Sequence, residues 1–459
     1  METPSKVNVA DIIDNSKMGI FQTGIFLLSG LCLIMDGFDV QSLGYAAPAI
    51  IQEWKIPSAA LGTVFGAGNL GVLIGSLLFT MLADKIGRRP VLIGATLFFS
   101  VLTFLTARVS SVNELLAIRL IAGLGLGCII PNATALIGEY SPRRKRVTLV
   151  MNITVGFTAG AMLGGFVSAW MIPAFGWRSV FYFGGAIPFI IAGAMLLWLP
   201  ESLQFLVVRR KNPDKVGLWL RRIDPTAPVG GHVEYVVPEE GREGVPVVHL
   251  FREGRTLGTI LLWIVNFMNL LNLYFLSSWL ATVIRDAGYP TSTAVLAATT
   301  LQVGGTIGTF GLSWLIARLG FIRVLTTCFA LACVSVAVIG QPGLSLSLLF
   351  VVVFVAGWCV VGAQPGVNAL AATYYPTSLR STGVGWGLGI GRAGAIVGPV
   401  LGGQFMSLHW STQDIFLAAA VPALISAITM FCLRWCISND TGNGTQEAQI
   451  RTQEAREEV

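Results

Sequence analysis

The chain has 459 residues, of which 54% are hydrophobic and only 12% are charged, whereas soluble domains carry about 25% charged residues. This composition excludes a soluble protein. The net charge of +6 does not indicate nucleic-acid binding, because most Lys and Arg lie in short polar segments between long apolar runs. The seven cysteines fall inside these runs and the three histidines are scattered, so we expect no metal site and no cofactor.

Long apolar runs follow one another along most of the chain. A helix needs about 20 mostly apolar residues to cross the hydrocarbon core of a bilayer. The runs are too long for strands and lack their alternation, so we predict an all-α membrane protein with 12 transmembrane helices. The expected spans are 20–46, 59–82, 89–107, 114–138, 147–171, 179–199, 257–284, 293–316, 323–341, 344–372, 383–408 and 413–436.

The positive charges predict the orientation of these spans. If the N-terminus is cytoplasmic, 24 of the 30 Lys and Arg residues fall in inner segments and only 4 in outer segments. Cytoplasmic loops carry such an excess of positive charge. We therefore expect both termini in the cytoplasm.

The two halves of the chain resemble each other. Residues 129–146 (IIPNATALIGEYSPRRKR) align with 363–380 (AQPGVNALAATYYPTSLR) at an offset of 234, and 156–165 align with 394–403 at an offset of 238. Two six-helix halves in the same orientation are one plan of secondary transporters. We expect an N-terminal bundle at 1–199, a cytoplasmic loop at 200–256, a C-terminal bundle at 257–436 and a cytoplasmic tail at 437–459.

The loop between the second and third spans, LADKIGRRP (82–90), resembles the signature loop of the major facilitator superfamily. Thr80 stands where that signature usually begins with Gly. In this family the loop acts with an acid near the end of the fourth span as a gating latch, so the resemblance implies a pseudo-symmetric fold of two six-helix bundles. We assign to the gating region Asp84, Lys85, Gly87, Arg88, Arg89, Glu139 and Arg380.

The first span, with MDGFDVQSLGYAAPAI (35–50), is similar to that of the aromatic acid:proton symporters, as are stretches such as 175–185 and 387–398. Known members carry benzoates, hydroxybenzoates and protocatechuate. The resemblance implies an importer of an aromatic carboxylate, coupled to protons, in the cytoplasmic membrane of a bacterium. We expect it to act as a monomer.

Two acids lie well inside the first span. Asp36 and Asp39 are three residues apart and share one helix face. An ionised carboxylate in the bilayer is costly and is usually functional, and desolvation favours its protonated form. We predict that this pair carries the proton. The alternative is that both acids are structural partners in ion pairs within a wet vestibule.

Two arginines also lie inside spans. Arg119 in the fourth span lies at nearly the depth of Asp36, so we predict that it faces the acid pair rather than extending to the headgroups. Arg392 lies near the midplane, where it either binds the carboxylate of the substrate or ties helices together.

Polar and aromatic side chains in other spans complete the predicted substrate site. Asn266, Asn269 and Asn272 repeat every three residues along one face of the seventh span. They either bind the substrate or form hydrogen bonds between helices. With Arg392, the substrate-binding candidates are Asn269, Asn272, Tyr274, Asn132, Gln302, Gln364, Asn368, Phe38 and Trp386.

Other functions remain as alternatives. An efflux antiporter, or a carrier for another organic anion, would share this fold. A membrane enzyme is disfavoured because no His or Cys lies beside a span acid in sequence, and a sensor because the loop and tail are short.

Overall fold

The computed structural model describes residues 5–209, 213–228, 233–237, 247–252, 254–376 and 378–457, with the side chains of residues 5, 147 and 435–457 left out. Twelve helical segments in these ranges are long and apolar enough to cross a membrane. The predicted fold class and number of spans are therefore confirmed. Parts of the expected cytoplasmic loop, and the side chains of the expected tail, lie outside the described residues.

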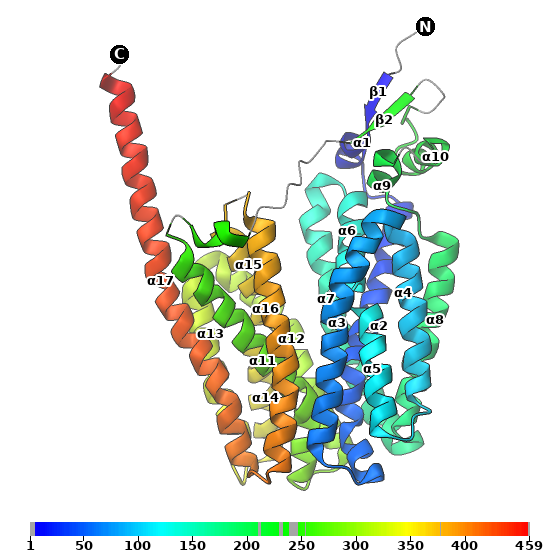
Figure 1. Cartoon of the computed structure of the whole chain (residues 1–459), viewed down its shortest axis with the longest axis vertical. Helices are drawn as coiled ribbons and strands as arrows, with labels where there is room; N and C mark the ends of the chain where they lie inside the picture. The colour runs from blue at the N-terminus through cyan, green and yellow to red at the C-terminus, as the bar shows by residue number, and fades with distance from the viewer. Residues whose placement is uncertain are drawn as a thin grey trace. The chain divides into compact units, whose positions relative to one another are not determined.

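The helices form two compact units. The first unit contains residues 1–242 and also Ser278–Thr299, where α11 ends and α12 begins. Figure 1 shows its spans running side by side. Its elements are β1 (Ser5–Asn8), α1 (Val9–Asn15), α2 (Ile20–Trp54), α3 (Ser58–Ile86), α4 (Arg88–Thr106), α5 (Val112–Leu126), α6 (Ile129–Tyr140), α7 (Arg143–Phe175), α8 (Arg178–Trp198), α9 (Leu203–Val208), α10 (Pro213–Ile223) and β2 (Val233–Val236).

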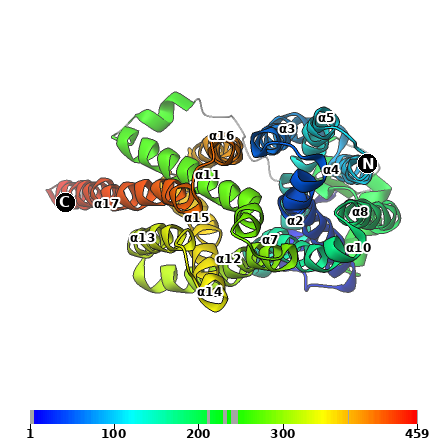
Figure 2. The ribbon, with the colours of Figure 1, turned by 90° about the horizontal axis from the view of Figure 1, so that it is seen from below.

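The second unit holds residues 243–277 and 300–459. Within it α13 packs against both α14 and α17, as Figure 2 shows from below. The last helix continues past the span that ends at Arg434 and reaches Glu457 (Figure 1). The elements that follow β2 are η1 (Val247–Phe251), α11 (Thr256–Asp286), α12 (Thr291–Leu319), α13 (Phe321–Ile339), α14 (Leu346–Val360), α15 (Ala363–Tyr374), α16 (Arg380–Ser407) and α17 (Thr412–Glu457).

Close contact between α2 and α7 depends on glycine. A Cβ atom at Gly37 would lie 1.9 Å from the carbonyl oxygen of Phe157, and one at Gly160 would lie 1.8 Å from that of Ile34. Without side chains at these positions the two backbones touch, which is how membrane helices gain packing energy. This crossing lies beside Asp36 and Asp39 on α2 and fixes the backbone that carries them.

The fourth and tenth spans are each broken near the middle. The fourth is divided into α5 and α6 around Gly127 and Cys128, and the tenth into α14 and α15 around Val361 and Gly362. The third residue of the second segment is Pro131 in one span and Pro365 in the other. Proline lacks a backbone N–H and clashes with the carbonyl four residues earlier, which favours a break at these two places.

Small elements cover one end of the first unit. The strand β1 pairs in parallel with β2, from Ser5 with Val233 to Asn8 with Val236. The helix α1 buries Val9 and Ile13. These two short strands lie outside the membrane spans and leave the all-helical membrane architecture unchanged.

Candidate functional site

A buried ion pair joins two spans of the first unit. The Nη1 atom of Arg119 on α5 donates to Oδ2 of Asp39 on α2 over 3.0 Å. The hydroxyl of Thr103 on α4 donates to the other oxygen, Oδ1, over 2.5 Å. Asp39 is fully buried and Arg119 is 5% exposed. The structure thus brings Arg119 to one of the two acids that it was predicted to face.

The remainder of the Arg119 guanidinium lies in an apolar setting. Its carbon Cζ sits 4.8 Å from the ring centre of Phe181 on α8, which is a cation–π contact. Its Nε and Nη2 atoms are buried and have no hydrogen-bond acceptor among the residues that the structure describes. Asp36, three residues before Asp39, is 2% exposed. The site therefore has one positive charge, two carboxylates and unused donor capacity on the arginine.

Four amide side chains form a network in the second unit. Asn269 on α11 donates to Oε1 of Gln364 on α15 over 2.7 Å. The amide nitrogen of Gln364 donates in turn to Oδ1 of Asn266 at 3.2 Å and of Asn368 at 3.1 Å. The predicted stripe on the seventh span thus meets the predicted residues of the tenth. The bonds of Gln364 with Asn269 and Asn266 join α11 to α15, which is the alternative considered for the stripe, whereas its bond to Asn368 lies within α15.

Asn272 differs from the other members of the stripe. It is 1% exposed, yet in the described part of the chain neither its amide nitrogen nor its amide oxygen has a hydrogen-bond partner. A buried amide without partners costs about 1–3 kcal/mol. It therefore offers one donor group and one acceptor to a ligand or to water.

Arg392 on α16 is half-buried and donates from Nη1 to the hydroxyl of Tyr274 on α11 over 3.2 Å. Within the described part of the chain, no Asp or Glu pairs with its guanidinium. Arg392 and Tyr274 therefore place a phenol next to a positive charge that lacks a protein counter-ion.

The remaining candidates are dispersed. Gln302 donates to the hydroxyl of Ser277 over 3.1 Å, and Asn132 donates to the backbone carbonyl of Cys128 over 2.8 Å. Trp386 stacks on Trp263 at 6.0 Å between ring centres and is 47% exposed.

The ring of Phe38 lies inside the first unit. It is 3% exposed and packs against Phe183 at 5.6 Å between ring centres, and a Cβ at Gly184 would touch it at 2.9 Å. Helix packing already occupies this ring, so we leave Phe38 out of the site proposed below.

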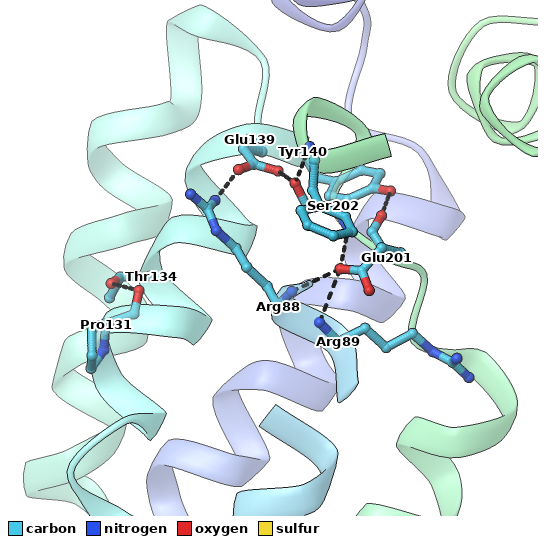
Figure 3. Close-up of polar contacts among 9 residues, drawn as sticks. Arg88, Arg89, Pro131, Thr134, Glu139, Tyr140, Glu201 and Ser202 are labelled. Atoms are coloured by element: carbon cyan, nitrogen blue, oxygen red, sulfur yellow. Dashed lines mark hydrogen bonds and ion pairs between the residues drawn. The ribbon is translucent and has the colours of Figure 1, made fainter. Parts of the chain in front are cut away.

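The signature loop forms a polar cluster at one end of the first unit (Figure 3). Arg88, at the start of α4, forms an ion pair with Glu139 near the end of α6. The hydroxyl of Ser202 donates to the second oxygen of Glu139 over 2.5 Å. Asp84, Lys85 and Arg380 are exposed. Gly87 has a φ of 109°, a backbone conformation that glycine adopts without strain.

Glu201, like Ser202, belongs to this cluster and was missed by sequence reasoning. Its Oε1 accepts from the backbone N–H groups of Arg88 at 2.9 Å and Arg89 at 3.0 Å. A carboxylate at the N-terminus of a helix interacts favourably with the helix dipole and so stabilises the helix. Here the carboxylate of Glu201 caps the first turn of α4. The tripeptide PES (200–202) after the sixth span was the available signal. Thr103 was missed too, because one threonine in an apolar run forms no pattern.

Buried charges within a twelve-span helical fold define a class of protein, the multi-pass membrane carriers. The profile of the Major Facilitator Superfamily matches residues 29–228 and 262–456. The chain therefore belongs to this superfamily and is a secondary transporter rather than an enzyme.

Characterised relatives and solved structures agree with this assignment. The 4-hydroxybenzoate transporter of Pseudomonas putida is 39% identical over 92% of this chain and 94% of its own length. The gallate transporter of the same organism is 38% identical over 92% and 94%. A crystal structure of a bacterial homolog to the human lysosomal transporter Spinster superposes with a TM-score of 0.71 at 17% identity, covering 92% of this chain and 99% of that one.

Proposed function

We propose that the protein imports an aromatic carboxylate of the benzoate or hydroxybenzoate type together with protons, by alternating access. It acts in the cytoplasmic membrane of a bacterium with both termini inside. The substrate class is supported by relatives that carry 4-hydroxybenzoate and gallate, at 39% and 38% identity over 92% of the chain. The single observation that carries proton coupling is the buried pair of Asp39 and Arg119.

The proton is carried by Asp36 and Asp39. Both carboxylates are buried, and Asp39 is paired with the Arg119 guanidinium. A buried acid that exchanges its arginine partner for a proton allows one proton to bind and leave as access to the site changes sides. When Asp39 is protonated, the unused donors of Arg119 are available to bind another anionic group in its place.

The substrate carboxylate binds Arg392, and Tyr274 orients the guanidinium. Arginine binds a carboxylate through two parallel hydrogen bonds, and Arg392 has no carboxylate partner among the described residues. The unpartnered amide of Asn272 is the group we assign to a ring hydroxyl. Gln302, Gln364, Asn269 and Asn368, which belong to the same unit, complete the polar lining.

Proton coupling also meets an energetic need. Moving one negative charge into a cell interior at −100 mV costs about 2.3 kcal/mol. One proton moving with a monoanion cancels this cost, and the pH gradient then drives accumulation.

Uptake of labelled 4-hydroxybenzoate, benzoate and gallate by cells that express the chain tests the proposal. We expect accumulation that a protonophore abolishes, and competition by aromatic acids but not by sugars. Arg392→Ala should abolish uptake. Arg392→Lys, which keeps the charge but not the paired geometry, should retain transport with a raised KM.

The matched control is Arg323→Ala, which removes an arginine at the start of α13 and should leave uptake unchanged. Accumulation that persists after the proton gradient collapses would refute proton coupling. Normal uptake by Arg392→Ala would refute the assignment of the substrate carboxylate. Outward transport driven by inward protons would favour the antiporter alternative.

A further inference from the structure

A groove of about 630 Å³ opens on the first unit where two of its spans end. Its walls come from the start of α2, the end of α8, the start of α4 and the short helices α9 and α10. The transport site proposed above does not use this groove. It lies at the level where apolar spans give way to the polar segments that follow α8.

One part of the groove carries positive charge. Arg89, Lys215 and Arg222 line it, against one acid among the described residues, Glu201, so that this lining has an excess of two positive charges. Glu201 is already engaged by the backbone N–H groups of Arg88 and Arg89.

Arg89 is held in place at the groove. Its Nε and Nη2 atoms donate to the backbone carbonyls of Leu199 and Leu196, each over 2.6 Å. Figure 3 shows its side chain extending away from the pair formed by Arg88 and Glu139. The carbonyl groups carry no net charge, so the positive charge of Arg89 still acts on the groove.

The other part of the groove is apolar and unusually exposed. Ile20 is 95% exposed, Leu197 is 76% exposed and Trp198 is 67% exposed. A Cβ atom at Gly24, which also lines the groove, would meet no atom of the described residues within 4 Å. In a membrane-spanning chain, surfaces of this kind at span ends face lipid, and tryptophan gathers at the interface with water.

We propose that this groove is a binding site for an anionic phospholipid. The phosphate lies among Arg89, Lys215 and Arg222, and an acyl chain lies along Ile20, Gly24 and Leu197. Basic pockets beside transmembrane helices bind anionic headgroups, and each nearby Lys or Arg contributes about 1 kcal/mol. A soluble anion would use only the charged part and leave the apolar wall uncovered, so one amphiphile explains both surfaces.

The test is titration of the purified full-length protein in detergent with phosphatidylglycerol, followed by native mass spectrometry. Phosphatidylcholine with the same acyl chains is the comparison. We expect tighter binding of phosphatidylglycerol. The variant Lys215→Gln/Arg222→Gln should weaken it about 30-fold, since two charges are lost. A matched pair outside the groove, Arg144→Gln/Arg221→Gln, removes the same charge and should leave binding unchanged.

The apolar wall has its own pair of variants on α2. Gly24→Leu fills the groove without altering charge and should weaken lipid binding. Gly30→Leu places the same side chain at a position that also has nothing within 4 Å but does not line the groove, so it should have no effect.

Three outcomes would overturn the proposal. These are equal loss of binding in the two charge-removal variants, equal effects of the two leucine substitutions, and displacement of the lipid by glycerol 3-phosphate at concentrations similar to those of the lipid itself. The first would indicate diffuse attraction to the charged face, and the last a site for soluble phosphate.

Discussion

At the scale of single residues, the contact between Asp39 and Arg119 has both a structural and a functional role. Asp39→Asn leaves the buried arginine without its ion-pair partner, and breaking a buried pair in this way costs about 3–5 kcal/mol. We therefore expect a lower melting temperature in detergent and loss of uptake.

The double variant Asp39→Asn/Arg119→Met separates the two roles. Removing both charges together is often neutral for stability, so thermal unfolding should return close to that of the wild type. Uptake should remain lost, because no carboxylate at position 39 can carry the proton. If the double variant still accumulates substrate against the substrate's own concentration gradient, and a pH gradient still drives this accumulation, the pair is only structural.

Sequence reasoning predicted part of this site. Comparing depths from the span ends was enough to bring Arg119 toward Asp39, because each residue of a helix advances a known 1.5 Å. The same reasoning could not find Thr103 or Phe181, since the face that each presents depends on helix rotation and packing. It could not distinguish Asn272 from Asn269 either. Both belong to one periodic stripe, and only the structure shows which amide lacks partners.

At the scale of helices, hydropathy predicted every span, but helix ends and breaks depend on local chemistry. The first span was expected to end at residue 46, yet α2 continues to Trp54. The run of apolar residues ends near the membrane boundary, whereas the backbone hydrogen bonds of the helix continue beyond it. The short strands β1 and β2 pair residues more than 200 positions apart, which no local pattern reveals.

The crossing of α2 and α7 gives a prediction at this scale. Gly37→Ala forces a methyl group against the carbonyl of Phe157, and overpacking of this kind costs about 1–3 kcal/mol. The melting temperature should fall. The control, Gly30→Ala on the same helix, meets open space and should be neutral or stabilising, because alanine is the better helix former. Equal melting temperatures for the two variants would contradict the role of Gly37 in this contact.

At the scale of the whole molecule, the distribution of charge predicts the orientation in the membrane. The bias of Lys and Arg toward one set of loops predicts both termini in the cytoplasm. Green fluorescent protein fused after Val459 should fluoresce, and alkaline phosphatase fused there should be inactive. Alkaline phosphatase inserted at Gln341–Gly343, between α13 and α14, should be active. The reverse pattern would place every loop on the side of the membrane opposite to the one proposed.

The broken fourth and tenth spans carry information about ancestry. Each break precedes a proline, and the two prolines, Pro131 and Pro365, are 234 residues apart, at matching places in the internal repeat. Two independent origins at the same aligned position are less economical than one. The break therefore belonged to a six-span precursor before its gene was copied, and it is older than any difference between the two halves of the present chain.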